Sequence, residues 1–168
     1  MKRIIYLLIL ITFSIKSFSQ EKLLDILPIE NGNVVYTEVV KVENINKKEL
    51  YNRAKKWVVL KYKSANDVIQ LDDKEDGIII GKGNFDIKYY SRKPTIEHTI
   101  QIENKDGRYK YTVSSFIYSD VQNDTFTIEK FPKSWFGKKK LYKALDEKVN
   151  SIIADLKKFM KTELKDDW

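Results

Sequence analysis

Residues 95–118 read TIEHTIQIENKDGRYKYTVSSFIY, and this stretch decides the fold because it encodes two strands joined by a tight turn. In the first half, isoleucines and His98 alternate with charged or polar residues. This alternation is typical of an antiparallel strand with one buried and one solvated face. Residues 104–107, Asn-Lys-Asp-Gly, predict a hairpin turn. The apolar side of the predicted return strand holds Tyr109, Tyr111, Val113 and Ile117.

Upstream of this hairpin, two more strands are predicted. Residues 85–89 alternate cleanly between apolar and charged side chains, and residues 68–71 form a shorter apolar run. Between them lies the acidic turn of residues 72–77, which ends in a glycine suited to a tight reversal. Gly81 and Gly83 suggest a bulge or sharp curvature in the longer strand.

Two helices are predicted, one before and one after these strands in the sequence. Asn46 is a good N-cap, and Glu49 is placed to complete a capping box by reaching back to the Asn46 amide. The first helix has an apolar face of Leu50, Ala54, Trp57, Val58 and Tyr62. Its remaining positions, which include Arg53, are predicted to be solvated. The second helix follows Gly137 and carries an apolar stripe of Leu141, Leu145, Val149, Ile152, Ile153, Leu156, Phe159, Met160 and Leu164.

Residues 34–42 are rich in β-branched side chains and predict the first strand. The order is then strand, helix, three or four further strands, helix. We therefore expect an α+β fold in which an antiparallel sheet of about five strands carries both helices on one face. The predicted organisation is a signal peptide (1–19), a lead-in segment (20–32), one domain (33–164) and a polar tail (165–168).

The first nineteen residues, MKRIIYLLILITFSIKSFS, have the pattern of a secretory signal: a basic start, an apolar stretch and small residues before the cleavage point. We expect cleavage between Ser19 and Gln20, which places the mature protein in the periplasm or outside the cell. A retained membrane anchor is the alternative. The apolar stretch is short for that role, because about 20 apolar residues are needed to span a bilayer.

Composition limits the chemistry that the chain can perform. The formal charge is +7, and removal of the three basic residues of the signal leaves +4, which is mildly basic. The absence of cysteine excludes disulfides, thiol catalysis and thiolate metal sites. With one histidine, His98, a histidine-rich zinc site is impossible. We predict no cofactor, no metal and no catalytic residue, and hence a non-catalytic protein.

The segment 130–140, KFPKSWFGKKK, mixes aromatic residues with lysines, a combination found at anionic membrane surfaces and acidic glycans. It is the best candidate for contact with a partner or membrane. The alternative is a helix lead-in whose Trp135 and Phe136 tuck into the core. The candidate contact residues are Lys130, Lys133, Trp135, Phe136, Lys138, Lys139 and Lys140.

Tyrosines crowd the predicted strands and suit a recognition surface on the sheet, because each has an apolar body and a polar tip. The candidates for sheet-face recognition are Tyr89, Tyr109 and Tyr111. The same tyrosines would equally suit a sheet edge.

Other chemical motifs have simpler interpretations. His98 could be a general base, but it lies on an isoleucine face and is predicted to be a core residue. The acidic residues of 72–76 lack the regular spacing of a calcium loop and predict a solvated turn. The run Gly81-Lys82-Gly83 lacks the lysine-serine or lysine-threonine ending of a phosphate loop. A pair of carboxylates could run hydrolysis, but nothing singles one pair out.

Three segments resemble a group of small exported bacterial proteins catalogued as a domain of unknown function with a TATA-binding-protein-like fold. They are residues 27–58, LPIENGNVVYTEVVKVENINKKELYNRAKKWV, residues 68–85, VIQLDDKEDGIIIGKGNF, and residues 107–118, GRYKYTVSSFIY. The resemblance implies a curved antiparallel sheet with two helices, in the order β-α-β-β-β-β-α, and no established activity. Function cannot be taken from the fold alone.

The sequence therefore predicts an exported, non-catalytic domain that binds an unknown protein or ligand at the bacterial cell envelope. The alternatives are a hydrolase that acts on an envelope polymer and a protein held at a membrane surface. Nucleic acid is disfavoured as a partner, because the chain has neither the charge pattern nor a base-reading motif.

Overall fold

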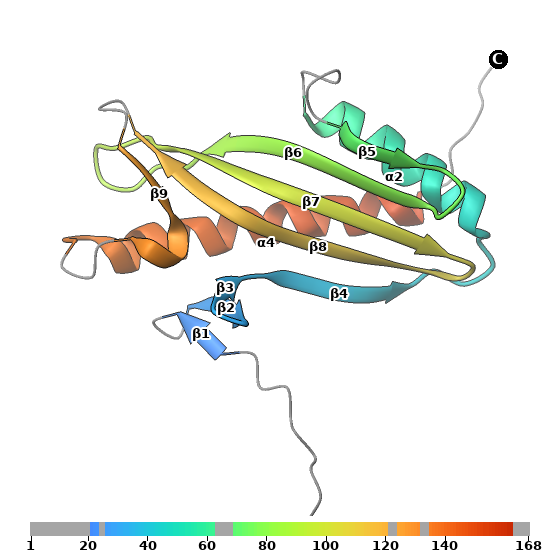
Figure 1. Ribbon diagram of the computed structural model, residues 1–168, viewed down its shortest axis with the longest axis horizontal. Helices are drawn as coiled ribbons and strands as arrows, with labels where there is room; N and C mark the ends of the chain where they lie inside the picture. The colour runs from blue at the N-terminus through green and yellow to red at the C-terminus, as the bar shows by residue number, and fades with distance from the viewer. Residues whose placement is uncertain (1–20, 24–25, 63–68, 121–123, 132–134, 163–168) are drawn as a thin grey trace, which may run out of the picture.

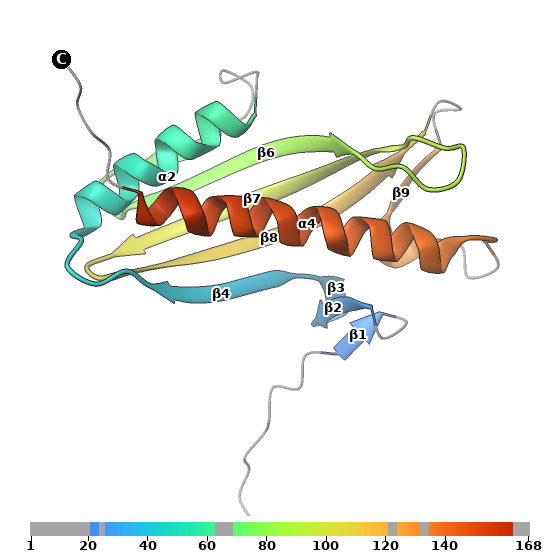
Figure 2. The ribbon, with the colours of Figure 1, turned by 180° about the vertical axis from the view of Figure 1, so that it is seen from behind.

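The fold is built on a six-stranded antiparallel sheet whose strands lie in the order β4-β8-β7-β6-β5, with β9 paired to β8. This computed structural model describes residues 21–23, 26–62, 69–120, 124–131 and 135–162. Both long helices cover one face of the sheet (Figure 1 and Figure 2). The predicted α+β class is confirmed, and the short strand β9 brings the sheet to six strands. The strands are β4 (Tyr36–Lys41), β5 (Ile69–Asp73), β6 (Ile78–Asp86), β7 (Thr95–Lys105), β8 (Arg108–Ser119) and β9 (Thr125–Thr127).

The predicted hairpin is the centre of the sheet. β7 and β8 pair from Lys105↔Arg108 outward, and Gly107 in the turn has φ 71°, a left-handed conformation that favours glycine. β6 pairs with β7 without interruption over its whole length. The alternation therefore predicted the pairing of β7 with β8 correctly. The strand predicted over residues 85–89 is displaced, because only residues 85 and 86 belong to β6 and Tyr89 lies in a separate reversal.

A bulge in β8 changes which residues face the helices. Glu97 pairs with Ile117 and Thr99 with Ser114, so Ser115 and Phe116 both lie opposite His98. Ser115 has φ 58°. Because the extra residue shifts the alternation by one, Phe116 and Tyr118 are fully buried. Ile117, which the simple alternation placed with Tyr109, lies on the other face and is half-buried.

The helices are α2 (Lys47–Lys61) and α4 (Lys138–Lys161), and η1 (Ile128–Lys130) is a single 3-10 turn. The predicted apolar face of α2 is buried throughout. On α4 the predicted stripe is buried, except that Phe159 is half-buried and Leu164 lies outside the described residues. Within the residues described, neither helix is long and apolar enough to cross a membrane.

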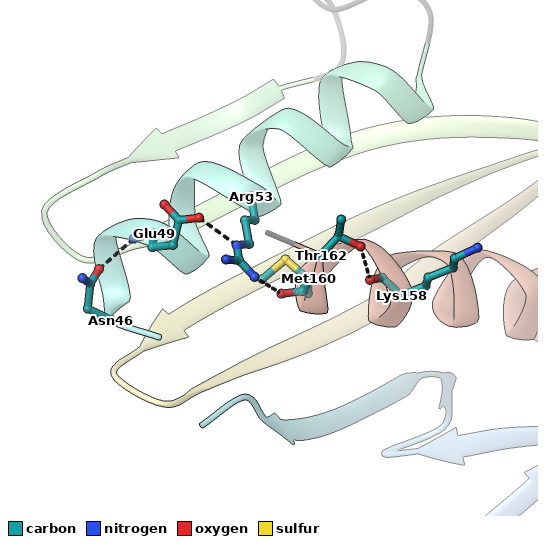
Figure 3. Close-up of polar contacts among 6 residues, drawn as sticks. All are labelled: Asn46, Glu49, Arg53, Lys158, Met160 and Thr162. Carbon is teal, nitrogen blue, oxygen red and sulfur yellow. Dashed lines mark hydrogen bonds and ion pairs between the residues drawn. The ribbon is translucent and has the colours of Figure 1, made fainter. Parts of the chain in front are cut away.

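Asn46 caps α2 as predicted, because its side chain accepts a hydrogen bond from the Glu49 amide at 2.9 Å. The reciprocal half of the expected capping box is wrong. The Glu49 carboxylate accepts a hydrogen bond from Arg53 Nε at 2.8 Å, and Arg53 is 4% exposed instead of solvated (Figure 3). Arg53 is held there because it also donates to the Met160 carbonyl on α4. The charge is therefore paired with an acid and a helix end, as a buried charge requires.

The lead-in segment contributes β1 (Glu21–Leu23) and β2 (Leu27–Glu30) to a separate three-stranded sheet, which β3 (Asn33–Val34), the start of the predicted domain, completes. Asn31 and Gly32 form the turn between β2 and β3, with φ 51° and 80°. The Val34 amide donates to Glu129 Oε1 at 2.8 Å, which ties this sheet to η1. The predicted signal peptide (1–19), Lys133 and the tail (165–168) lie outside the described residues.

Candidate functional site

The candidate site lies at one end of the molecule, where the connection between β6 and β7 meets the start of α4. Figure 1 and Figure 2 show these two segments at the end opposite the C-terminal end of α4. Side chains from both segments line an open cavity of about 500 Å³, which we call the tip pocket. Its lining residues are Tyr89, Tyr90, Ser91, Arg92, Trp135 and Phe136.

A tight reversal forms one wall of the tip pocket. The amide of Tyr89 donates to the Arg92 carbonyl at 3.2 Å, and the amide of Arg92 donates back to the Tyr89 carbonyl at 3.1 Å. Between them, Tyr90 has φ 54°, which is uncommon for a bulky residue. This conformation places Tyr90 at the turn, where it is 49% exposed.

The other wall comes from the residues before α4. The rings of Tyr90 and Phe136 are stacked, with centroids 6.0 Å apart and an angle of 23°. Gly137, the N-cap of α4, has φ 89°, and a Cβ at this position would lie 2.7 Å from Tyr90 Cε2. Glycine is therefore required twice over, for the backbone angle and for the close approach to Tyr90.

Cations cover the aromatic faces of the site. The Arg92 guanidinium lies 4.9 Å from the Trp135 ring centre, and Lys140 Nζ lies 4.1 Å from that of Tyr90. These distances are in the range of cation–π contacts. A hydrogen bond with the Tyr118 hydroxyl raises the pKa of Arg92, so the guanidinium stays charged.

The chemistry of the lining suits recognition. The described residues that line the tip pocket offer rings, hydroxyls and a guanidinium, and none of them is a carboxylate, histidine or thiol. Rings bind by stacking and by burial of apolar surface, and guanidinium groups bind anions. The arrangement can therefore hold a ligand that combines negative charge with apolar surface.

The predicted segment 130–140 contributes directly to this site. Trp135 is half-buried and packs on Phe131 with ring centroids 5.2 Å apart. Phe136 is 87% exposed, so the alternative in which both rings tuck into the core is wrong for Phe136. Of the predicted lysines, Lys140 lies over the Tyr90 ring of the site and Lys138 over the Tyr142 ring of α4. Lys130, Lys139 and Lys140 are exposed, Lys138 is half-buried and Lys133 lies outside the described residues.

The three tyrosines predicted for sheet-face recognition are buried instead. Tyr89, Tyr109 and Tyr111 are 4%, 1% and 4% exposed. Tyr109 and Tyr111 point to the face that the helices cover, because they share the alternation of the apolar residues of β8. Burial raises the pKa of both hydroxyls, which stay protonated. Of the three, Tyr89 alone lines the tip pocket.

His98 is a core residue, as predicted. It is 2% exposed, and its Nε2 lies 2.7 Å from the Tyr62 hydroxyl. The rings of Phe85 and Phe116 pack against it. Burial lowers the pKa of His98 to about 4, so the imidazole is neutral at physiological pH.

Of the acidic residues of 72–76, Asp72 and Asp73 end β5, and Glu75 and Asp76 lie in the turn that leads to β6. Asp72 pairs with Lys55 and accepts a hydrogen bond from Tyr51, and these contacts lower its pKa. Asp73 accepts a hydrogen bond from the Asp76 amide at 2.9 Å. Across the described part of the chain, no group of three or more histidine or acidic residues is arranged to hold a metal ion.

Sequence reasoning missed Ser91 and Arg92 as site residues. They lie in the stretch Tyr-Tyr-Ser-Arg-Lys-Pro, residues 89–94, between two strands. Two aromatic residues followed by two basic residues in a short connection are a usable signal for a contact site. What the sequence could not show is that this connection lies beside Trp135, more than 40 residues away in the chain.

Comparisons with known proteins find one family. A family model described as a domain of unknown function (DUF4468) with TBP-like fold matches residues 36–119. The match ends before the segment that supplies Trp135 and Phe136, and it includes the other wall of the tip pocket. No curated protein matches the chain.

Several solved chains are similar to this one, among them two bacterial proteins. A TBP-like protein from Parabacteroides distasonis has a TM-score of 0.72 and 22% sequence identity, over 81% of this chain and 97% of that protein. A DUF4468 family protein from Bacteroides ovatus has a TM-score of 0.71 and 16% identity, over 88% of this chain and 98% of that protein. At these identities the likeness shows the fold alone.

Proposed function

The chain belongs to the DUF4468 family of domains of unknown function with a TBP-like fold, and on this premise we propose that it is an exported, non-catalytic binding domain of the bacterial cell envelope. Its ligand or partner is bound at the tip pocket. The observation that supports this proposal most is the open cavity lined by rings and a guanidinium, in which Phe136 is 87% exposed.

The exposure of Phe136 needs a functional explanation. Most aromatic side chains of this domain are buried, whereas the Phe136 ring is exposed and contributes little to the core. Large exposed apolar groups that cluster beside a pocket are typical of contact surfaces. Tyr90, stacked on Phe136 and 49% exposed, extends the same surface.

Two observations favour binding over catalysis. The titratable group best suited to proton transfer, His98, is buried among aromatic rings and has a pKa lowered to about 4. The described lining of the tip pocket provides no nucleophile paired with a base. The signal-like residues 1–19 support export, and two of the similar structures come from bacteria.

The test uses protein recovered from the envelope of bacteria that express the full 168-residue chain. N-terminal sequencing should show Gln20 as the first residue. The isotope-labelled protein is then titrated separately with lipid, saccharide and protein fractions of the envelope, and amide shifts are followed by NMR. We expect one fraction to shift the amides of residues 89–92 and 135–137 in a saturable way and to be recovered chemically unchanged.

Two results would contradict the proposal. If no fraction moves the amides around the tip pocket, the pocket is not a binding site for envelope components. If a fraction is converted into a new product during the titration, the domain is an enzyme. A Phe136→Ala variant controls for shifts that arise elsewhere, because it should lose the response at the pocket while its other amides stay in place.

A further inference from the structure

The partner of the tip pocket can be specified further, and this step rests on the proposed function. We propose that the tip pocket docks the protein on an anionic lipid surface, with the rings of Phe136 and Tyr90 at the level of the headgroups. The basic residues around the rings then face the lipid phosphates. The contact is peripheral and involves the tip of the molecule only.

The shape of the surface supports this partner. Phe136 and Tyr90 have stacked rings and come from two segments far apart in the sequence, the connection between β6 and β7 and the residues before α4. Both segments lie at one end of the molecule (Figure 1). Phe136 is the most exposed large hydrophobic side chain in the described residues. Tyrosine and tryptophan are enriched at the interface between membrane and water because their rings carry a polar tip, and phenylalanine is common on the apolar face of helices that lie in this interface.

The charges around the rings are complementary to anionic lipid. Lys138, Lys139 and Lys140 are consecutive in the first turn of α4, which contains no acidic residue. Arg92 lies over Trp135 on the opposite side of the tip pocket. Asp120 is the acidic group nearest to this arginine, at 4.0 Å, and it is also held by the Tyr118 hydroxyl. Basic residues close to an anionic membrane each strengthen binding about fivefold, which corresponds to ~1 kcal/mol.

Lipid is favoured over a saccharide because of the hydrogen-bonding capacity of the site. A sugar must have its hydroxyls paired when it is bound, since unpaired polar groups lose hydration without compensation. Phe136 has the most exposed ring of the site and its side chain has no polar atom, so this part of the surface cannot pair with the hydroxyls of a sugar. Docking on a lipid surface needs charge and exposed rings but no fixed set of directional partners.

The test is co-sedimentation with vesicles at about 0.15 M salt, the physiological ionic strength. The processed protein, recovered from bacteria that express the full chain, is mixed with one of two kinds of vesicle. One contains phosphatidylglycerol and phosphatidylcholine in equal parts, and the other contains phosphatidylcholine alone. We expect binding to the first and little binding to the second. Phe136→Ala should lower the partition coefficient about tenfold, since burial of most of a phenylalanine side chain is lost. Lys139→Ala should lower it about fivefold.

Matched controls come from exposed positions away from the tip. Val39 on β4 is 56% exposed, and Lys56 is an exposed lysine on α2. Val39→Ala and Lys56→Ala should leave vesicle binding within twofold of the original. Circular dichroism of every variant shows that a loss of binding is not a loss of folding, and Phe136 and Lys139 are both exposed positions whose substitution should be tolerated.

The lipid proposal is overturned if the anionic vesicles are not bound, if both vesicle types bind equally, or if Phe136→Ala and Lys139→Ala bind as well as the original. These failures are distinguishable from failure of the proposed function. If vesicles fail and a soluble anionic saccharide or an envelope protein shifts the amides of the tip pocket, the binding function stands with another partner. If neither vesicles nor any envelope fraction acts at the tip pocket, both proposals fail.

Discussion

Arg53 Nη1 donates a hydrogen bond to the carbonyl oxygen of Met160 at 3.0 Å, so a side chain of α2 satisfies a backbone acceptor in the last turn of α4 (Figure 3). The last carbonyls of a helix have no partner within the helix. A cation at this position also interacts favourably with the helix dipole. The contact joins residues 107 positions apart and holds the N-terminal half of α2 against the C-terminal end of α4.

Replacement of Arg53 by methionine should lower the free energy of unfolding by about 1–3 kcal/mol, because the Met160 carbonyl then lacks its donor and Glu49 loses its ion pair. Urea denaturation measures the effect. Lys56→Met, at an exposed position of the same helix, is the matched control and should change stability by less than about 0.5 kcal/mol. Equal effects of the two substitutions would show that the contact between Arg53 and Met160 does not stabilise the domain.

His98 should make the domain acid-sensitive. Its pKa is lowered from 6.5 to about 4 in the folded state by burial, so between these values the unfolded chain binds a proton that the folded chain does not. The free energy of unfolding should fall by ~1.4 kcal/mol per pH unit in this window as pH decreases, about 3 kcal/mol in all. Above about pH 6.5 the contribution is constant.

A His98→Gln variant isolates this effect, because glutamine does not titrate. Urea denaturation at intervals from pH 7.5 to 4 should show the acid-dependent loss in the original protein and a flatter profile in the variant. Asp72 and Asp155, whose pKa values are lowered by lysine contacts, lose stabilisation only at lower pH and do so in both proteins. Parallel profiles would mean that His98 is protonated in the folded state.

Gly83 is required because the ring of Tyr62 lies directly over it. A Cβ at this position would clash with Cε1 and Cδ1 of Tyr62 and lie 2.7 Å from its Cζ. Gly83→Ala should destabilise by about 1–3 kcal/mol and displace the Tyr62 hydroxyl from His98. The ring signals of His98 in NMR report that displacement. Gly32→Ala, where nothing lies within 4 Å, should leave those signals unchanged although its positive φ also causes strain.

Two neighbouring tyrosines of β8 should respond oppositely to removal of the hydroxyl. Tyr111 donates to Glu38 Oε2 at 2.9 Å, and Tyr111→Phe should lower stability by about 1 kcal/mol. The buried Tyr109 hydroxyl has no hydrogen-bond partner among the described residues. Tyr109→Phe should therefore be neutral or stabilising by up to about 1 kcal/mol. Thermal unfolding of both variants checks this, and a similar loss in both would indicate a partner for Tyr109.

Lys139→Glu should raise the stability of the domain and at the same time weaken its binding to anionic vesicles. The first turn of α4 carries three lysines, which are unfavourable near the positive end of a helix dipole. An acidic residue there should raise the free energy of unfolding by about 0.3–1 kcal/mol. The same substitution should weaken binding to phosphatidylglycerol vesicles about 25-fold, because the net charge falls by two. A variant that is more stable and binds equally well would show that this lysine has no part in binding.

Much of the fold could be predicted because its strands and helices have strong local periodicity. The alternation in residues 95–105 and the stripe on α4 each bury a single face, and both were correct in the structure. The bulge at Ser115 was missed. Ser114 and Ser115 interrupt the alternation, but the pairing of β8 with β7 alone reveals that a residue is added there. Arg53 was misplaced for the same kind of reason, since its partner Met160 lies on another helix.

The candidate site was predicted in part. The mixture of aromatic residues and lysines before α4 pointed to Trp135 and Phe136, which do line the tip pocket. The tyrosines of the sheet were placed on the wrong face, because alternation identifies which residues share a face but not which face the helices cover. Tyr90 and Arg92 line the pocket only because the connection between β6 and β7 lies beside the residues before α4, a contact that local pattern does not predict.

The sequence by itself determined the elements, their order and the α+β class, because the period of apolar residues dictates which face of each strand or helix must be buried. Only the tertiary structure decided which segments meet at the tip. The stacking of Tyr90 on Phe136 depends on the tight reversal of residues 89–92 and on the left-handed Gly137, which bring together two surfaces that local pattern leaves unrelated. Contacts between distant residues are set by how whole elements pack, and no local period encodes them.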